Sequence, residues 1–390
     1  MSDLAAFRND VRHWLERHCP DELRGTAASF EGGMKEPPSE AQRRWFDAAL
    51  ERGWTVPAWP RAYGGAGLDA DQHRALRVEM AAYGAPAPLT GMGVSMIGPT
   101  LLEFGTDAQK GEHLRNIAHG KVRWCQGYSE PGAGSDLASL KTRAELHGDS
   151  YRINGSKIWT SFADKADWIF CLVRTDPSAP KHDGISFVLF AMDQPGVTVK
   201  PIHLIAGNSD FCQCFFDDVT ALKANLIGQE NRGWTVAKRL LQHERAMISG
   251  PGGGIRTRGS LTELAKCYTG ERDGRIADTA TRDEVAAIEM DARAFALTLR
   301  RATEENSAGR TETFVTSMFK YYSTELDARR AEANVRFMGT RGVGWEGGEF
   351  TPHELSTTRT WLFGKALTIA GGSSEVQLNI VAKRVLGLPD

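Results

Sequence analysis

The stretch WCQGYSEPGAGSDLASLKTRAELHGDSYRINGSKIWTS, Trp124 to Ser161, begins where the hydrophobic period of the chain changes from helical to strand-like. Within it, Asn154-Gly155 lies between two alternating runs, which predicts a two-residue hairpin turn. Four more strand-like runs follow, separated by Gly, Pro and Asp: DWIFCLVRTD, GISFVLFAMD, GVTVKPI and FCQCFFDDV. The sequence therefore predicts a compact β-domain of about a hundred residues.

Helical periodicity flanks this β-domain on both sides. Before it, apolar residues recur at helical spacing over residues 4–15, 39–52, 71–83 and 107–118. After it, helices are expected over residues 234–249, 281–305, 311–338 and 374–386, with lengths that suit an antiparallel bundle. The chain is thus expected to be α+β, with an N-terminal helical domain (1–121), a middle β-domain (122–232) and a C-terminal helical bundle (233–390).

The composition narrows the class of partners. The chain has 390 residues and a net charge of −2, which gives no reason to expect nucleic acid or an anionic membrane as a partner. No apolar run reaches the length of a membrane span, and the N-terminus lacks the layout of a signal peptide. Six scattered cysteines without a CxxC pair indicate reduced thiols in the cytoplasm, and the ten histidines show no metal-ligand spacing.

The Gly-rich segment SEPGAGSD is the first candidate binding element. Gly132 and Gly134, together with the hydroxyls of Ser129 and Ser135, predict a tight polar loop at the end of a strand. Backbone N–H groups and hydroxyls in such a loop can hold a polar heterocycle or a phosphate. Taken alone, the segment could equally be a simple turn, and Trp159 could equally be a core residue.

Taken together, the motifs resemble the acyl-CoA dehydrogenase family over essentially the whole chain. The resemblance is carried by SEPGAGSD followed by INGSKIW, by GPTLLEFGTDAQKGEHL and CFFDDV, and by LNIVAKRVLGLP near the end. It is closest in type to the pimeloyl-CoA dehydrogenase large subunit and related bacterial enzymes. It implies that family's fold, with a middle β-barrel or sandwich and a C-terminal four-helix bundle. It also implies FAD as cofactor and a role in lipid metabolism by fatty-acid β-oxidation.

The resemblance assigns the site residue by residue. FAD is expected to contact the loop after the first strand, the end of the INGSKIW strand and the final loop: Gln126, Tyr128, Ser129, Gly134, Ser135, Trp159, Thr160, Ser161, Ser373 and Glu375. Ser135, Arg245 and Ala370 are expected to meet the acyl-CoA. No metal is expected.

The final loop, TIAGGSSEVQ, raises the question of the catalytic base. Desaturation needs a carboxylate to take the α-proton, and many family members place a Glu at the position of Gly371, whose backbone amide still donates to the thioester carbonyl. A branch of the family places its base in an "ER" pair on the first helix after the β-domain. Glu244-Arg245 matches that pair, so Glu244 is the predicted base. A Glu on the helix surface, paired with a cation, is the competing interpretation.

Other departures from the family concern the pocket and the assembly. Ala370 replaces a common aromatic, and the Gly250–Gly254 run adds small residues, so a bulky, branched, ring-bearing or carboxyl-ended acyl chain is expected. Arg336 and Thr340 replace residues of the turn that holds the adenosine end of FAD. The family's FAD sites are completed across subunits, so the resemblance implies a homotetramer, or a heterotetramer in which a second subunit of the same type completes the altered site. It also implies an electron-transfer flavoprotein as acceptor. Alternatives are an acyl-CoA oxidase, a flavin monooxygenase of this fold, or a non-catalytic partner subunit.

Overall fold

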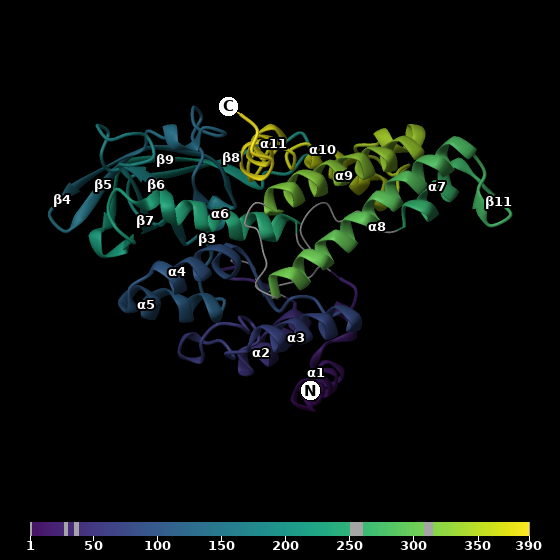
Figure 1. Ribbon diagram of the computed structural model, residues 1–390, viewed down its shortest axis with the longest axis horizontal. Coiled ribbons are helices and arrows are strands. Elements are labelled where there is room, and N and C mark those ends of the chain that lie inside the picture. The colour runs from purple at the N-terminus through teal and green to yellow at the C-terminus, as the bar shows by residue number, and fades with distance from the viewer. Residues whose placement is uncertain (1, 27–29, 35–38, 250–259, 308–314, 390) are drawn as a thin grey trace. The chain divides into compact units, whose positions relative to one another are not determined.

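The computed structural model describes residues 2–26, 30–34, 39–249, 260–307 and 315–389, and within these it leaves out the side chains of residues 2, 243–249, 303, 306–307 and 315. The chain forms two compact units (Figure 1). The first comprises Met1–Ile202 and Asp210–Leu240, and the second comprises His203–Ser209 and Leu241–Asp390. Helix α6 (Gly233–Ser249) crosses the division. The predicted boundaries at 121/122 and 232/233 stay predictions.

The first unit opens with helices that pack around aromatic side chains. They are α1 (Ser2–His18), α2 (Glu40–Glu51), α3 (Ala70–Tyr83), α4 (Gly98–Phe104) and α5 (Asp107–Ala118). Three of them start with capping boxes, at Ser39, Asp69 and Thr106, in which side chains satisfy the first amides. In their core, Trp14 of α1 contacts Trp45 of α2 in a tilted arrangement and Trp54 edge-on.

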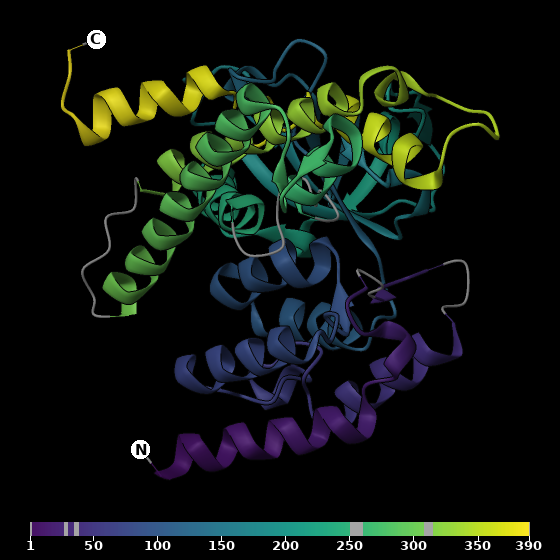
Figure 2. The same ribbon diagram turned by 90° about the vertical axis from the view of Figure 1, so that its right-hand side faces the viewer.

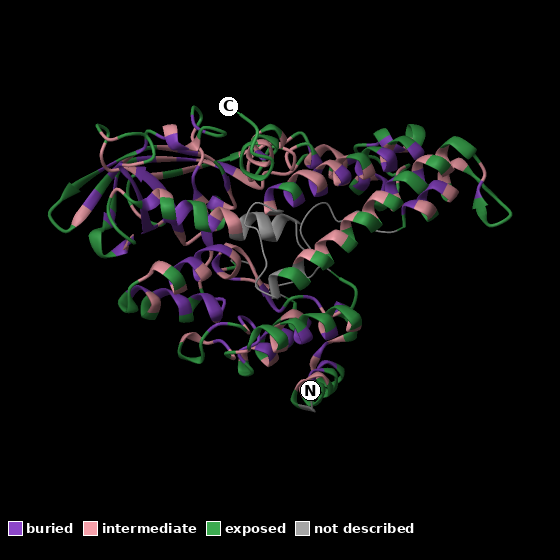
Figure 3. Ribbon diagram, viewed as in Figure 1, coloured by how far each residue is buried: buried purple, intermediate pink, exposed green. Residues whose placement is uncertain are grey.

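An eight-stranded sheet follows in the same unit. Its order is β10-β7-β6-β4-β5-β9-β8, with β3 paired parallel to β6. The strands are β3 (Trp124–Gly127), β4 (Arg143–His147), β5 (Ser150–Ser161), β6 (Trp168–Arg174), β7 (Ile185–Ala191), β8 (Val197–Ile202), β9 (Phe211–Leu222) and β10 (Leu226–Ile227). The central strands β6 and β7 are buried along nearly their whole length, whereas the edge strand β8 is not (Figure 3).

The hairpin predicted at Asn154-Gly155 is wrong. β5 runs unbroken through both residues, and the turn that joins it to β4 lies at Gly148-Asp149. Asn154 instead bonds across to β9: its Nδ2 donates to Asp218 Oδ1 at 3.0 Å and its Oδ1 accepts the Asp218 N–H at 2.9 Å. A Cβ on Gly155, which has a φ of +150°, would lie 2.6 Å from Thr142 Oγ1. The glycine is therefore required by close packing and not by a turn.

The second unit is helical. It contains α7 (Leu261–Thr269), α8 (Thr279–Ser307), α9 (Val315–Phe337), α10 (Pro352–Gly364) and α11 (Ser374–Ile380), with a small hairpin of β11 (Glu271–Arg272) and β12 (Arg275–Ile276). α9 is the central element and packs against α7, α8, α10 and α11. α7 and α10 were not among the predicted helices. α10 did carry a sequence signal, a capping box between Thr351 and Glu354 with Pro352 at the first helical position.

The cysteines and the hydropathy of the helices can be compared with the predictions of reduced thiols and of no membrane span. All six cysteines are free thiols, and only Cys267 is exposed. None of the helices in the described part of the chain has the length and hydropathy that a membrane span requires.

Candidate active site

The polar loop after β3 is a tight turn tied to β5. Glu130 and Ala133 exchange two backbone hydrogen bonds of 3.0 Å across Pro131-Gly132. One step earlier, the Ser129 carbonyl accepts the N–H of Ile158 at 2.9 Å. The loop therefore lies alongside the end of β5, and the two halves of the predicted flavin motif meet.

A buried ion pair holds the loop against the strand. The Lys157 side chain is 0% exposed, and its Nζ donates to the Tyr128 carbonyl at 3.0 Å and to Glu130 Oε1 at 2.8 Å. The Glu130 carboxylate also accepts the N–H groups of Lys141 and Thr142, at 2.7 and 2.9 Å. Burial by itself would raise the pKa of Glu130, but the Lys157 charge and these hydrogen bonds outweigh it and lower the pKa. Glu130 is therefore ionised and fixed.

A bulge in β5 turns Trp159 outward. The pairing of β5 with β9 shifts register between Lys157 and Thr160, because β5 has one extra residue there. Trp159 has a left-handed φ of 62° and is 54% exposed, whereas Thr160 is buried. Phe211 supports the indole edge-on, with ring centroids 6.3 Å apart. A strained, exposed tryptophan beside a polar loop is typical of a ligand-binding position and not of a core.

The first unit thus contains eight of the residues predicted to hold FAD. Gln126, Ser129 and Ser161 are half-buried, Tyr128 and Thr160 are buried, and Gly134, Ser135 and Trp159 are exposed. A Cβ added to Gly134 would meet no atom within 4 Å. A flat, polar heterocycle needs an exposed aromatic face beside hydroxyls and open backbone, and this arrangement fits it.

The final loop lies in the second unit, between α10 and α11. Gly371 and Gly372 have left-handed φ values of 65° and 95°, and Ala370 before them is exposed. Ser373 caps α11 by accepting the Val376 N–H at 3.4 Å. The side chains of Lys320 and Gln377 bind this turn from α9 and α11.

Glu375 opens α11 with an ionised carboxylate. Its pKa is lowered first by its own backbone N–H, then by the Ser373 hydroxyl, and further by the charge of Lys320. Ser373 and Glu375, both predicted to contact the cofactor, are therefore joined in one cap. Glu244 and Arg245 lie on α6, but their side chains fall outside the described residues, as does the Gly250–Gly254 run.

Ion pairs flank the Gly339–Val343 turn, where the family resemblance predicts the adenosine end of FAD. Arg336 is paired with Glu284 of α8. Arg341 binds the Glu354 carboxylate through two hydrogen bonds, at 2.7 and 2.9 Å, and Tyr268 donates to it at 3.0 Å. Arg341, together with the Thr351 N–H, lowers the pKa of Glu354 to about 2. The turn Gly339–Val343 is thus anchored to α10 by a charged cluster.

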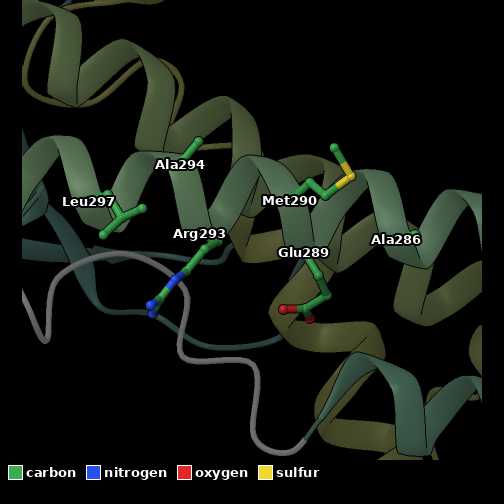
Figure 4. Close-up of a pocket in the computed structure, with 6 residues that line it drawn as sticks. All are labelled: Ala286, Glu289, Met290, Arg293, Ala294 and Leu297. Carbon is green, nitrogen blue, oxygen red and sulfur yellow. The ribbon is translucent and has the colours of Figure 1, made fainter.

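A shallow depression on α8 is separate from these residues. It is lined by Ala286, Glu289, Met290, Arg293, Ala294 and Leu297, and contains none of the predicted site residues (Figure 4). Met290 and Leu297 are 71% and 50% exposed. Within the described part of the chain, no group of His, Cys, Asp and Glu residues could hold a metal ion.

Family models identify the chain. The acyl-CoA dehydrogenase N-terminal domain matches residues 2–121, the middle domain residues 125–219 and the C-terminal domain residues 231–386. The chain belongs to the acyl-CoA dehydrogenase family. Its three-part fold, a helical part, a sheet and a second helical part, is that of the family and confirms the predicted fold class. As a member of this family, the chain is a flavin-dependent oxidoreductase.

One curated relative and two solved structures match this chain over its full length. Acyl-CoA dehydrogenase IpdE1 of Mycobacterium tuberculosis is 37% identical over 396 residues, covering 100% of this chain and 99% of that protein. Among solved structures, the Tcur3481-Tcur3483 steroid ACAD has a TM-score of 0.78 at 29% identity, covering 100% of this chain and 98% of that one. The ChsE4-ChsE5 complex of M. tuberculosis has a TM-score of 0.77 at 28% identity, with the same coverage.

Proposed function

We propose that this acyl-CoA dehydrogenase introduces a double bond between the α and β carbons of an acyl-CoA thioester, with Glu244 as the base. The observation that carries the proposal is the Gly371 turn. A left-handed glycine offers no side chain where many family members place their carboxylate. The base must then come from another element, and Glu244 of α6 matches the alternative position.

Two groups of the chain divide the work on the thioester. The α-proton is weakly acidic, so charge that develops on the carbonyl oxygen must be stabilised as the proton leaves. The Gly371 amide serves as a donor to that oxygen. The Glu244 carboxylate takes the α-proton, which requires a distance of about 3 Å in the complex.

The first unit holds the FAD through the β3 loop and the β5 bulge. Tyr128, Ser129 and Ser135 would supply polar contacts to the flavin, and the exposed indole of Trp159 would pack against it. Bound there, FAD supplies the acceptor for the hydride that leaves the β-carbon. Ser373 and Glu375 of the final loop are the other residues that we assign to FAD.

A bulky, ring-bearing acyl group is the substrate that the family context favours. The structural neighbours include a steroid ACAD. In this chain Ala370 and Gly371 leave the tip of the final loop without large side chains. Arg245 and Ser135 are the residues that we assign to the CoA part of the substrate.

A second subunit, either a copy of this chain or a related dehydrogenase subunit, completes the assembly, as a tetramer. Two structural neighbours are two-component proteins, Tcur3481-Tcur3483 and ChsE4-ChsE5. The C-terminal segment ends in the yellow helix and the label C of Figure 2. Four of its large apolar residues are exposed, Leu378, Val385, Leu386 and Leu388. Such a patch is typical of a protein interface.

An electron-transfer flavoprotein is the proposed acceptor of the electrons from the reduced flavin.

The test is a panel of CoA thioesters added anaerobically to the purified yellow protein. Steroid-side-chain, branched, dicarboxylic and straight-chain thioesters are compared by the loss of flavin absorbance and by the enoyl-CoA product. Bleaching by a ring-bearing thioester supports the proposal. The proposal is contradicted if the protein is colourless and binds no flavin, either alone or with a related dehydrogenase subunit. It is also contradicted if turnover is confined to straight acyl chains of medium length.

A further inference from the structure

We propose that Lys320, acting with Gln377, is a positioning residue of the reaction, because it sets the direction in which the Gly371 turn presents its amide. The inference rests on the proposed function, in which that amide is a donor to the substrate carbonyl.

Lys320 is a fully buried lysine that is committed to the backbone of the final loop. It lies on α9 and is 0% exposed. Its Nζ donates to the Gly372 carbonyl at 2.7 Å and to the Thr368 carbonyl at 3.3 Å. An ammonium group inside a protein must be hydrogen-bonded, and here the bonds join the two ends of one turn.

Gln377 holds the centre of the same turn. Its side chain is 1% exposed, and its Nε2 donates to the Gly371 carbonyl at 3.0 Å and to the Gly372 carbonyl at 3.3 Å. A Cβ added to Gly372 would lie 2.5 Å from this nitrogen. The turn therefore needs glycine at 372 both for its φ and for this contact.

The hydrogen bonds to the Gly371 and Gly372 carbonyls also fix the direction of the two N–H groups that follow Gly371. In a trans peptide the C=O of one residue and the N–H of the next point in opposite directions. With the carbonyls of Gly371 and Gly372 directed at Lys320 and Gln377, the N–H groups of Gly372 and Ser373 point away from them. Within the described part of the chain, the N–H groups of Gly371, Gly372 and Ser373 have no acceptor.

Gly371 lies between peptides that are held on both sides. Upstream, the Thr368 carbonyl accepts from Lys320 and from the Ser374 N–H at 2.9 Å. Downstream, Ser374 Oγ donates to Glu325 of α9 at 2.6 Å. Lys320 and Glu325 thus anchor the turn to the central helix of the second unit, on both sides of the Ala370–Gly371 peptide that carries the proposed donor.

The experiment compares Lys320→Met with Lys365→Met in the FAD-loaded enzyme. Lys365 lies beside the same turn, but its side chain is 47% exposed and makes a loose pair with Glu332 at 3.4 Å. The readout is the absorption of bound para-hydroxycinnamoyl-CoA, which moves to longer wavelength when donors polarise its thioester carbonyl. Lys320→Met should lose most of this red shift and reduce the rate of flavin reduction about 10- to 100-fold, as expected for a misplaced donor. Lys365→Met should match the wild type in both.

A second variant covers the case in which Lys320→Met does not fold. Gln377→Leu removes the other donor from the turn and should show the same loss of red shift with flavin retained. A wild-type red shift and rate in a folded Lys320→Met, or in Gln377→Leu, would overturn the positioning role. A wild-type enzyme that neither shifts the probe nor is reduced by any thioester would instead overturn the proposed function, so the two failures can be told apart.

Discussion

The two loops assigned to the reaction are held in similar ways by buried lysines. In the first unit, Lys157 binds the Tyr128 carbonyl of the β3 loop at 3.0 Å. In the second unit, Lys320 binds the Gly372 carbonyl of the final loop at 2.7 Å. Both lysines are 0% exposed, and each loop stands beside a residue with left-handed backbone, Trp159 or Gly371.

The difference lies in what else each lysine binds. Lys157 has a buried carboxylate partner, Glu130, at 2.8 Å, whereas Lys320 bridges two carbonyls. Removing Lys157 leaves the Glu130 carboxylate buried without its cation, whereas removing Lys320 leaves two carbonyls without a donor and takes a positive charge away from the exposed Glu375 carboxylate. We therefore expect loss of Lys157 to lower the stability of the protein. Loss of Lys320 should chiefly change the direction in which the final loop presents its amides. The left-handed residue also differs, because glycine adopts that conformation freely and tryptophan does not.

The largest effect is expected from Lys157→Met. Loss of one partner of a buried ion pair destabilises a protein by about 3–5 kcal/mol, so the free energy of unfolding should fall by that amount in urea denaturation. The double variant Lys157→Met/Glu130→Gln should recover part of the loss, because no charge is then stranded. Lys141→Met, whose side chain is exposed while its N–H still binds Glu130, is the matched control. A stable Lys157→Met would break the comparison.

Acid should loosen the first loop before it loosens the Arg341–Glu354 cluster of the second unit. The pKa of Glu130 is lowered in the folded state, so its contribution is present above the ordinary Glu pKa of about 4.3 and is lost as pH falls through the lowered value. Glu354 has a pKa of about 2 and should hold the Gly339–Val343 turn to lower pH. Amide hydrogen exchange between about pH 5 and pH 2 checks the order. Glu130→Gln should remove the first step, and simultaneous loss at both places would count against it.

The smallest effects concern the two left-handed residues. Gly371→Ala should lower the free energy of unfolding by about 1–2 kcal/mol, the cost of a left-handed conformation for a residue with a Cβ.

Trp159→Gly relieves a similar cost but loses the edge-on contact with Phe211, worth about 0.5–1.5 kcal/mol. The net change in the free energy of unfolding should therefore be near zero. Its FAD affinity should nevertheless fall. Denaturation of the flavin-free protein and FAD titration separate the two effects, and unchanged FAD binding would argue that Trp159 is not a ligand-binding residue.

The sequence was sufficient for the buried strands and for the family, but not for the course of β5 or for the residues that hold the site. The continuous apolar runs WIFCLV and ISFVLF located β6 and β7, because a short run of this kind between turn residues is typical of a strand buried on both faces. The Asn154-Gly155 pair led to a wrong hairpin prediction. Its actual role, pairing with β9 at a bulge, depends on Asp218, which is distant in sequence. Lys157 and Lys320 could not be recognised as buried, because lysine is usually exposed and only the fold shows which carbonyls surround them.

The most direct test of the account is the reduction of bound flavin by a CoA thioester in Glu244→Gln under anaerobic conditions. If Glu244 is the base and Gly371 contributes only its amide, reduction should slow by about 10²- to 10⁴-fold while FAD content stays that of the wild type. Adding Gly371→Glu should restore part of the rate, less the cost of about 1–2 kcal/mol for glutamate in a left-handed conformation. Flavin reduction by Glu244→Gln at the wild-type rate would contradict the assignment of the base.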